Sequence, residues 1–429
     1  MDPCLYDAYV QILREELKPA MGCTEPIAVA YAGALARKAL GRFPKCVRLR
    51  VSGNIIKNVK SVIVPHTGGR KGLRTAVAAG LLFGQAEKEL EALSDAEEAQ
   101  LLKLDACLEE LDMTIERSDA RNPFDIQLWA DEAYVRILGT HTNVVEVRSG
   151  GRILVSKPYE DTPLTAPENR KLLSVEHIVT FADTVKLSDV EGLLETQIRL
   201  NTAIAREGMS GQYGAGIGKI LLRSYGNSVQ NRAKAYAAAG SDARMNGCEM
   251  PVVINSGSGN QGLTASLPVI IYAEEIGASR EMLYRALVVS NLTAIHLKTG
   301  IGTLSAYCGA TSAGAGAGAG IAYLYGGRYQ EIAHTVVNTL AINSGMICDG
   351  AKSSCAAKIA SAVEAGLLGM QMYMHDSQFY GGDGIVVKGV ENTIRAVGEL
   401  AREGMKETDL EIIHLMMSGE TGAQQQKER

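Results

Sequence analysis

Aromatic residues are scarce in this chain, at 5% of its 429 residues, and only one of them is tryptophan. The same chain holds 46 glycines and is 46% hydrophobic. Small residues let helix backbones approach one another closely, so this composition favours closely packed helices. A chain of this length buries a large core and is expected to form two or three domains.

Basic clusters are absent, and the net charge is −5. Phosphate backbones and anionic membrane surfaces attract basic patches, so we expect neither nucleic acid nor a membrane as partner. No positively charged N-terminus precedes an apolar stretch with a cleavage site, so no signal peptide is visible and we expect a cytoplasmic protein. In that reducing compartment, the eight cysteines are expected to be thiols, ligands or catalytic groups rather than disulfides.

Residues 299–327 contain no charged side chain, which raises the question of a membrane span. The stretch also carries nine glycines and several Ser, Thr and Tyr residues, which make it too polar for a spanning helix. We therefore predict a pair of buried helices with a small-residue face.

The hydrophobic patterns predict an α+β fold, in which a smaller α/β domain is inserted near the N-terminus of a large, mainly α-helical domain. We expect an N-terminal helical segment (1–45) that packs on the large domain, the α/β domain (46–165), and the helical domain (166–429). Pro19 and Pro26 separate two N-terminal helices, and the tail 421–429 is expected to be disordered. Strands are predicted at 46–58, 60–68, 112–118, 126–141 and 143–157.

Gly257, Gly259 and Gly262 form a G-x-G-x-x-G pattern that imitates a dinucleotide-binding loop. The true loop needs a crossover helix before the next strand, and Pro268 follows only six residues after Gly262, so no βαβ unit fits. Two readings remain for NSGSGNQG. It is either an anion site, with donors from Ser256, Ser258 and Asn260, or a turn between packed helices.

Cys308, Cys348 and Cys355 have the most suggestive neighbours among the cysteines. In one continuous helix Cys348 and Cys355 would lie about 10 Å apart along the axis, but nearby glycines place Cys348 in a loop and Cys355 in the first helical turn. Thiolates at a helix start gain from the helix dipole. No His stands at zinc spacing, and three thiolates on an iron–sulfur cluster leave one iron open as a Lewis acid. Buried structural cysteines are the alternative.

Five motifs follow one another along the chain: MGCTEPIAVAYA, SGNIIKNVKSVIVPHTG, SGSGNQG, YCGATSAG and GMICDGAKSSCAAKIASAV. Together they resemble the L-cysteine desulfidase family (UPF0597), which is related to the iron–sulfur L-serine dehydratases through their catalytic alpha domain. The resemblance implies a 4Fe-4S cluster and a carbon–sulfur lyase of cysteine catabolism. Without pyridoxal, such an enzyme converts L-cysteine to pyruvate, ammonia and hydrogen sulfide by β-elimination.

Carried over position by position, the resemblance places the cluster ligands at Cys308, Cys348 and Cys355. Cys23 in GCTEP matches the remaining functional cysteine of the family, as the catalytic base or as a fourth cluster ligand. Because Cys23 stands between a glycine and a helix start, we expect it to have the lowered pKa that a thiolate base needs.

Substrate contacts are expected from Ser256, Ser258, Gly259 and Asn260, whose loop would receive the carboxylate of a small amino acid. Asn54 and His66 belong to matching motifs and are further candidates. A homodimer is also possible on this resemblance. Two alternatives stay open: an iron–sulfur L-serine dehydratase, in which hydroxide leaves instead of sulfide, and a non-catalytic thiol- or metal-binding protein on the same fold.

Overall fold

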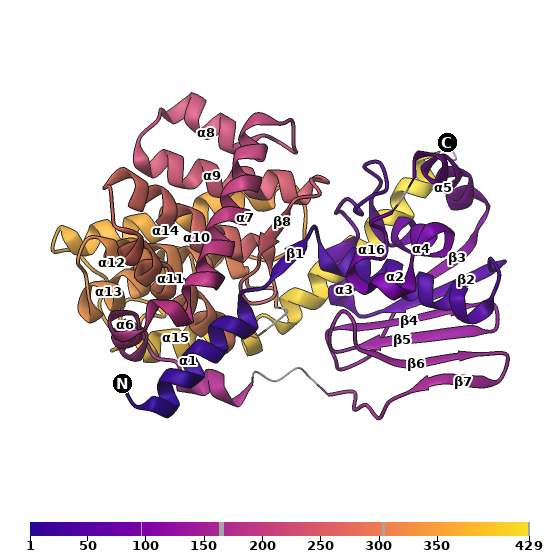
Figure 1. Ribbon diagram of the computed structural model, residues 1–429, viewed down its shortest axis with the longest axis horizontal. Coiled ribbons are helices and arrows are strands. Elements are labelled where there is room, and N and C mark those ends of the chain that lie inside the picture. The colour runs from indigo at the N-terminus through magenta and orange to yellow at the C-terminus, as the bar shows by residue number, and fades with distance from the viewer. Residues whose placement is uncertain (96, 163–166, 303–304, 428–429) are drawn as a thin grey trace.

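The computed structural model describes the whole chain except residues 96, 163–166, 303–304 and 428–429. Two lobes lie side by side, a large helical lobe and a smaller lobe built on one sheet (Figure 1). This arrangement confirms the predicted α+β fold with a large helical part. We call the two parts the helical lobe and the sheet lobe.

The helical lobe is assembled around a single hydrophobic core that draws on both ends of the chain. A short antiparallel pair, β1 (Pro19–Met21) with β8 (Pro251–Val253), lies on its side toward the sheet lobe (Figure 1). Its helices are α1 (Pro3–Glu16), η2 (Glu168–Leu172), α6 (Val175–Thr184), η3 (Leu187–Asp189), α7 (Glu191–Ser210), α8 (Ile217–Tyr225), α9 (Val229–Met245), α10 (Gly259–Glu275), α11 (Arg280–Ile301), α12 (Gly309–Leu324), α13 (Tyr329–Ile342), α14 (Cys355–Met374) and α15 (Val390–Glu399).

Helix α12 explains the stretch without charges. All its residues after Gly309 are buried, and its glycines bring it against the backbones of α11 and α14. A Cβ added at Gly314 would lie 2.3 Å from the carbonyl oxygen of Ala362, and one at Gly316 would lie 2.4 Å from that of Ser290. The predicted small-residue face and burial are therefore confirmed over α12, but the described part of the stretch holds this one helix and the end of α11 rather than the expected pair. Residues 303–304 of the same stretch lie outside the described part. No helix within the described residues is both long and apolar enough to cross a membrane.

The sheet lobe carries six strands in the order β3-β2-β4-β5-β6-β7. β2 and β3 are parallel because the helices between them form a crossover, and the other neighbours are antiparallel. Helix α2 packs on β4, β5 and β6, and α4 packs on α2. The elements are α2 (Thr24–Leu40), β2 (Cys46–Val51), α3 (Gly53–Val59), α4 (Gly72–Phe83), η1 (Ala86–Glu91), α5 (Glu98–Glu110), β3 (Asp112–Arg117), β4 (Asp125–Ala130), β5 (Ala133–Leu138), β6 (Val144–Ser149) and β7 (Arg152–Ser156).

Two predicted strands are wrong in part. The strand expected over 46–58 ends at Val51, and the chain continues as helix α3, in which the adjacent Ile55 and Ile56 are both buried. A strand would send two adjacent side chains to opposite faces, whereas a helix can bury both. The expected strand 60–68 is a loop with a single bridge between Ile63 and Lys71.

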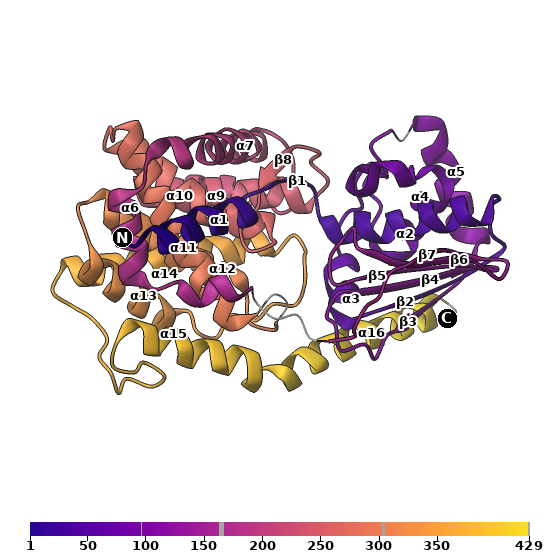
Figure 2. The same ribbon diagram turned by 60° about the horizontal axis from the view of Figure 1, so that its bottom comes forward.

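The expected domain division also differs from the structure. Helix α1 packs in the helical core, as expected, but α2 belongs to the core of the sheet lobe, so the chain crosses between lobes near residue 22 rather than residue 45. The C-terminal α16 (Lys406–Lys427) leaves the helical lobe through η4 (Leu400–Gly404) and runs along the sheet lobe, where it contacts α3 (Figure 2). The backbone of residues 421–427, expected to be disordered, continues this helix.

Candidate active site

Two loops of the helical lobe bring Cys308 and Cys348 together. Tyr307 and Ile347 form an isolated antiparallel bridge. The Cys308 N–H donates to the Met346 carbonyl at 3.0 Å, and the Cys348 N–H donates to the Ala306 carbonyl at 2.6 Å. Cys308 thus stands directly before α12, and Cys348 lies in the loop that leads to α14.

Cys355 is the first residue of α14, so the expected loop position of Cys348 and helix-start position of Cys355 are both confirmed. The Cys355 thiol points back toward that loop, with its Sγ 3.6 Å from the carbonyl oxygen of Gly350. Cys355 is also close to the other two thiols. Its charge raises the pKa of Cys308, and the charge of Cys348 raises the pKa of Cys355. The fold therefore gathers three thiols that are separated by up to 47 residues in the chain.

Two buried lysines face these thiols. Lys57 of α3 is 1% exposed and Lys298 of α11 is 6% exposed. A hydrogen bond from the Cys308 thiol, aided by the two lysines, holds the pKa of Cys348 well below its usual range. The same hydrogen bond to Cys348, together with burial, keeps the pKa of Cys308 high. Burial lowers the pKa of Lys298 to about 8, against the opposing effect of the neighbouring thiols. The two lysines make the surroundings of the cysteines cationic, which favours anions and offsets part of the cost of their burial.

This donor set fits an iron–sulfur cluster better than a single metal ion. Within the described part of the chain, no three His, Cys, Asp or Glu side chains lie close enough to hold one ion. A cluster instead binds each cysteine through a different iron atom, so its thiolates need not converge on one point. Soft thiolates beside two buried cations suit an anionic iron–sulfur group, and Cys308, Cys348 and Cys355 are the residues that would hold it.

Cys23 lies on the other side of Cys355. It precedes the first residue of α2, is 2% exposed, and shares a small apolar cluster with Val62, Met245 and Cys355. The expectation of a lowered pKa is wrong: burial raises the pKa of the Cys23 thiol to about 11, although the charge of Arg244 opposes the shift. Desolvation outweighs the favourable helix start because a thiolate here would be cut off from water.

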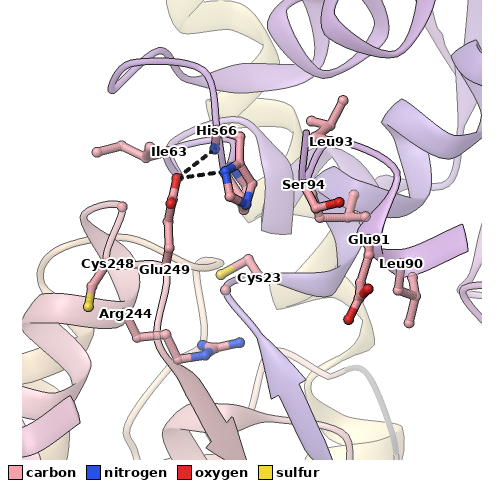
Figure 3. A pocket seen from close by; sticks show the side chains of 14 residues that line it. Cys23, Ile63, His66, Leu90, Glu91, Leu93, Ser94, Arg244, Cys248 and Glu249 are labelled. Carbon is pink, nitrogen blue, oxygen red and sulfur yellow. Dashed lines mark hydrogen bonds and ion pairs between the residues drawn. The ribbon is translucent and has the colours of Figure 1, made fainter. Parts of the chain in front are cut away.

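A pocket of about 160 Å³ opens between the lobes beside Cys23. Cys23 and His66 reach it from the sheet lobe, and Arg244 and Glu249 reach it from the helical lobe (Figure 3). Both the backbone N–H and Nδ1 of His66 contact Oε1 of Glu249, at 3.2 and 3.0 Å. His66 has a φ of 57°, an uncommon backbone conformation for a residue other than glycine. The contact joins the two lobes across one wall of the pocket.

The glycine loop forms the start of α10, as the anion-site reading requires, but no βαβ unit accompanies it. Ser258 caps α10 and accepts a hydrogen bond from the N–H of Gln261. Ser256 has a φ of 50°, and its hydroxyl donates to Asn255, whose amide is bound in turn by buried Asn291. These buried amides hold the loop in place. Ser256, Ser258, Gly259 and Asn260 do not themselves line the pocket.

Asn54 is separate from the pocket as well. It lies on α3, one turn before Lys57, and its Oδ1 atom is buried without a hydrogen-bond partner in the described structure. His296 of α11 also lies away from the pocket, where it pairs with Glu391 at 2.7 Å. The structure thus brings the four cysteines together and places His66 with Cys23, but it does not bring Asn54 to the pocket.

Arg244 is the pocket residue that sequence reasoning missed. It is the penultimate residue of α9, within the segment SDARM, which carries no recognisable motif. It is 7% exposed, and its guanidinium extends beneath Cys23 into the pocket (Figure 3). Its Nη1 donates to Oδ1 of Asn260 at 3.3 Å, which connects the pocket to the glycine loop.

Comparison of the sequence with known proteins identifies the family of this chain. Residues 77–414 match the family described as serine dehydratase alpha chain. A UPF0597 protein of Desulfitobacterium hafniense (strain Y51) is 56% identical over 96% of this chain and 97% of its own length. UPF0597 proteins of Lachnoclostridium phytofermentans and Treponema denticola are 47% and 44% identical, over 96% and 97% of this chain and 100% and 99% of their own lengths. The chain therefore belongs to the UPF0597 family, which is related to the serine dehydratase alpha chain.

The match to the serine dehydratase alpha chain begins inside α4. It includes the three cysteines at the α12 and α14 helix starts, the glycine loop and Arg244. Cys23, Asn54 and His66 lie before it. The part of the pocket formed by Cys23 and His66 is thus covered by the full-length relatives but not by the match to the serine dehydratase alpha chain, whereas the sheet-lobe residues Leu90 to Ser94 fall inside that match.

Proposed function

We propose that this protein is an L-cysteine desulfidase, a carbon–sulfur lyase that depends on a 4Fe-4S cluster and uses no pyridoxal. The observation that carries the proposal is the convergence of Cys308, Cys348 and Cys355 beside the buried Lys57 and Lys298. Neighbouring cations lower the free energy of thiolates and of an anionic cluster at a partly buried site. When bound, the cluster supplies a Lewis acid that accepts the departing sulfur.

The reaction removes the α-proton of L-cysteine and breaks its Cβ–S bond. The electron pair of the Cα–H bond becomes the new double bond, and the sulfur leaves with the electrons of the Cβ–S bond. The resulting aminoacrylate tautomerises to an imine, which water hydrolyses to pyruvate and ammonia. The overall change is L-cysteine plus water to pyruvate, ammonia and hydrogen sulfide, so no oxidant or reductant is needed.

The position of Cys23 is compatible with both proposed roles, the catalytic base and the fourth cluster ligand. It lines the pocket on one side and contacts the apolar group around Cys355 on the other. A thiol with a pKa of about 11 is protonated at neutral pH, which weakens its case as an unaided base. Coordination to a metal deprotonates a thiol outright, so the role of a displaceable fourth ligand does not require a free thiolate at neutral pH.

The remaining predicted residues have supporting roles in this proposal. We assign the loop of Ser256, Ser258, Gly259 and Asn260 an indirect role in binding the carboxylate, because it reaches the pocket only through the hydrogen bond between Asn260 and Arg244. His66 closes the pocket wall through Glu249. Asn54 lies outside the pocket, on the helix that carries Lys57, so we give it no contact with the substrate.

The test is anaerobic purification with iron and sulfide analysis, followed by parallel incubation with L-cysteine and L-serine. We expect close to four iron and four sulfide per chain and release of sulfide and pyruvate in equal amounts from L-cysteine. A protein with a full cluster that releases neither product from L-cysteine would refute the proposal.

The match to the serine dehydratase alpha chain favours a second candidate, L-serine dehydratase. The same site chemistry applies, with hydroxide as the leaving group. Pyruvate formation from L-serine with higher kcat/KM than from L-cysteine would select this candidate.

A further inference from the structure

Arg244 is a buried cation without a carboxylate partner. Within the described residues it forms no ion pair, and its one hydrogen bond through the side chain goes to the neutral amide of Asn260. Its Nε atom is buried and has no hydrogen-bond partner. A charge held in this way is costly, because the solvation it has lost is not replaced by an opposite charge.

The carboxylates at the pocket do not fill this gap. Glu249 is engaged by His66 of the sheet lobe through two contacts, and no ion pair joins it to Arg244 among the described residues. Glu91 lies on the exposed sheet-lobe rim. The guanidinium therefore faces the pocket with its charge uncompensated.

Gly259 and Asn260 orient this guanidinium against the first turn of α10. A Cβ at Gly259 would lie 2.3 Å from Nε of Arg244, so only glycine leaves room for the side chain there. Asn260 accepts from Nη1 on the same turn. The planar donors of the arginine line the pocket, and the first turn of a 17-residue helix, with its N-terminal N–H groups, adjoins them outside that lining.

We propose that Arg244 binds the carboxylate of the substrate, with the first turn of α10 as the second half of the same anion site. A guanidinium offers two parallel N–H groups that match a carboxylate, and this pairing is strong where water is excluded. The ligand class is a small amino acid or related carboxylate, in keeping with the pocket volume of about 160 Å³. The identity of the amino acid rests on the proposed function, whereas the carboxylate site does not.

The test measures binding rather than turnover. L-Alanine has no leaving group on Cβ, so the full-length protein does not consume it, and L-alaninamide lacks only the carboxylate charge. Ligand-observed NMR titration of both compounds would be run on wild type, Arg244→Gln and Gly259→Ala. Arg232→Gln is the matched control, because Arg232 lies on the same helix and pairs with Glu275 at the surface.

We expect wild type and Arg232→Gln to bind L-alanine and to ignore L-alaninamide. Arg244→Gln should weaken L-alanine binding about 10- to 100-fold, the usual range for loss of hydrogen bonds to a charged group. Gly259→Ala keeps the charge but pushes the guanidinium away, so it should weaken binding in the same direction. Gly259→Ala also keeps the test open if Arg244→Gln does not fold, as judged by thermal unfolding.

The inference would be overturned if Arg244→Gln bound L-alanine as tightly as wild type does. If that variant does not fold, unchanged affinity in Gly259→Ala would overturn it instead. The absence of saturable L-alanine binding by wild type would also overturn it. Such a result together with normal sulfide release from L-cysteine would leave the proposed function standing. Arg244-dependent L-alanine binding by a protein that eliminates neither L-cysteine nor L-serine would instead refute the proposed function and support the carboxylate site.

Discussion

Two buried cations near the site, Lys298 and Arg244, lack the carboxylate partners that a buried cation elsewhere in the chain has. Arg170 shows the ordinary case: it is buried, and both Glu15 and Glu16 pair with it. Lys298 and Arg244 are equally buried but have no such carboxylate among the described residues. A buried charge without a counter-charge is a feature of ligand sites, so these two residues support the proposed sites for an anionic cofactor and an anionic substrate.

The three cysteines provide the first residue-scale prediction. Cys308→Ser, Cys348→Ser and Cys355→Ser should each purify anaerobically with much less iron than wild type, because a hydroxyl is a poor ligand for cluster iron. Cys107→Ser is the control, since Cys107 lies on α5 of the sheet lobe. Iron and sulfide analysis decides the matter, and a full complement of iron in any one variant would remove that cysteine from the ligand set.

Cys23→Ala extends this series and separates the two roles of Cys23. Activity should fall about 10²- to 10⁴-fold, the usual contribution of a general base, in either case. An intact four-iron cluster in the inactive variant would assign the base role, and loss of iron would assign the fourth ligand. Near-normal turnover with a full cluster would exclude both roles.

Asp242 gives a residue-scale prediction about pH. Its carboxylate on α9 is 1% exposed and accepts a hydrogen bond from the Ile217 N–H at 2.6 Å. Burial raises its pKa to about 6, against an ordinary value of 3.8. Between these values the folded protein holds the proton and the unfolded chain has released it, so the free energy of unfolding falls as the pH rises from about 4 to about 6.

Asp242→Asn removes this titration. Between pH 4 and pH 7 the free energy of unfolding of wild type should fall, and that of Asp242→Asn should fall by on the order of 2–3 kcal/mol less. Urea unfolding at a series of pH values measures the difference. Parallel pH profiles for the two proteins would show that Asp242 titrates alike in the folded and unfolded states.

At the scale of elements, backbone-to-backbone contact between helices determines the helical lobe. Glycines on α12 and α14 face each other: a Cβ at Gly318 would lie 2.6 Å from the carbonyl oxygen of Gly366. Larger side chains would separate the two helices that begin at Cys308 and Cys355. The small-residue stretch therefore determines how close the cysteines lie.

Gly314→Ala tests this contact. The added methyl would lie 2.3 Å from the carbonyl of Ala362, so we expect a loss of about 1–3 kcal/mol in the free energy of unfolding. Gly192→Ala makes the same change on α7, where nothing lies within 4 Å, and should stabilise by about 0.5–1 kcal/mol through helix propensity. Denaturant unfolding compares them, and equal effects of the two variants would contradict the packing account.

For the molecule as a whole, α16 connects the C-terminus to the site. The helix crosses from the helical lobe to the sheet lobe (Figure 2), and its Asp409 pairs with Lys57 at 2.5 Å. The same Lys57 contacts the carbonyl of Ser305 and lies near Cys348. Lys57, a buried residue of the sheet lobe, therefore contacts α16 and the helical lobe and lies beside the cysteines.

Asp409→Asn should cost about 3 kcal/mol of unfolding free energy, because it leaves Lys57 buried without its counter-charge. Glu403→Gln is the control, as its pair with Lys406 is exposed and should contribute less than about 1 kcal/mol. Adding Lys57→Met to Asp409→Asn should recover part of the loss. A stability of Asp409→Asn within error of wild type would show that the pair does not hold α16 in place.

Much of the fold could be predicted from local patterns. Prolines at 19 and 26 end and begin helices where expected, because they restrict the backbone wherever they occur. The positions of Cys348 in a loop and Cys355 at a helix start follow from nearby glycines in the same way. The helical stretches after residue 174 and the strand pairs after residue 112 were also predictable, since their periodicity is a property of the segment itself.

Other features depend on parts of the chain that meet only in the folded protein. The sequence alone determined which residue types could hold a cluster and where helices begin. Tertiary structure decided that α2 joins the sheet lobe, that the Cys23 thiol has a raised rather than a lowered pKa, and that Arg244 enters the site. Burial and charge at Cys23 come from Cys355 and Arg244, more than 200 residues away along the chain. Desolvation and charge depend on distance in space, so no pattern within SDARM or GCTEP could reveal them.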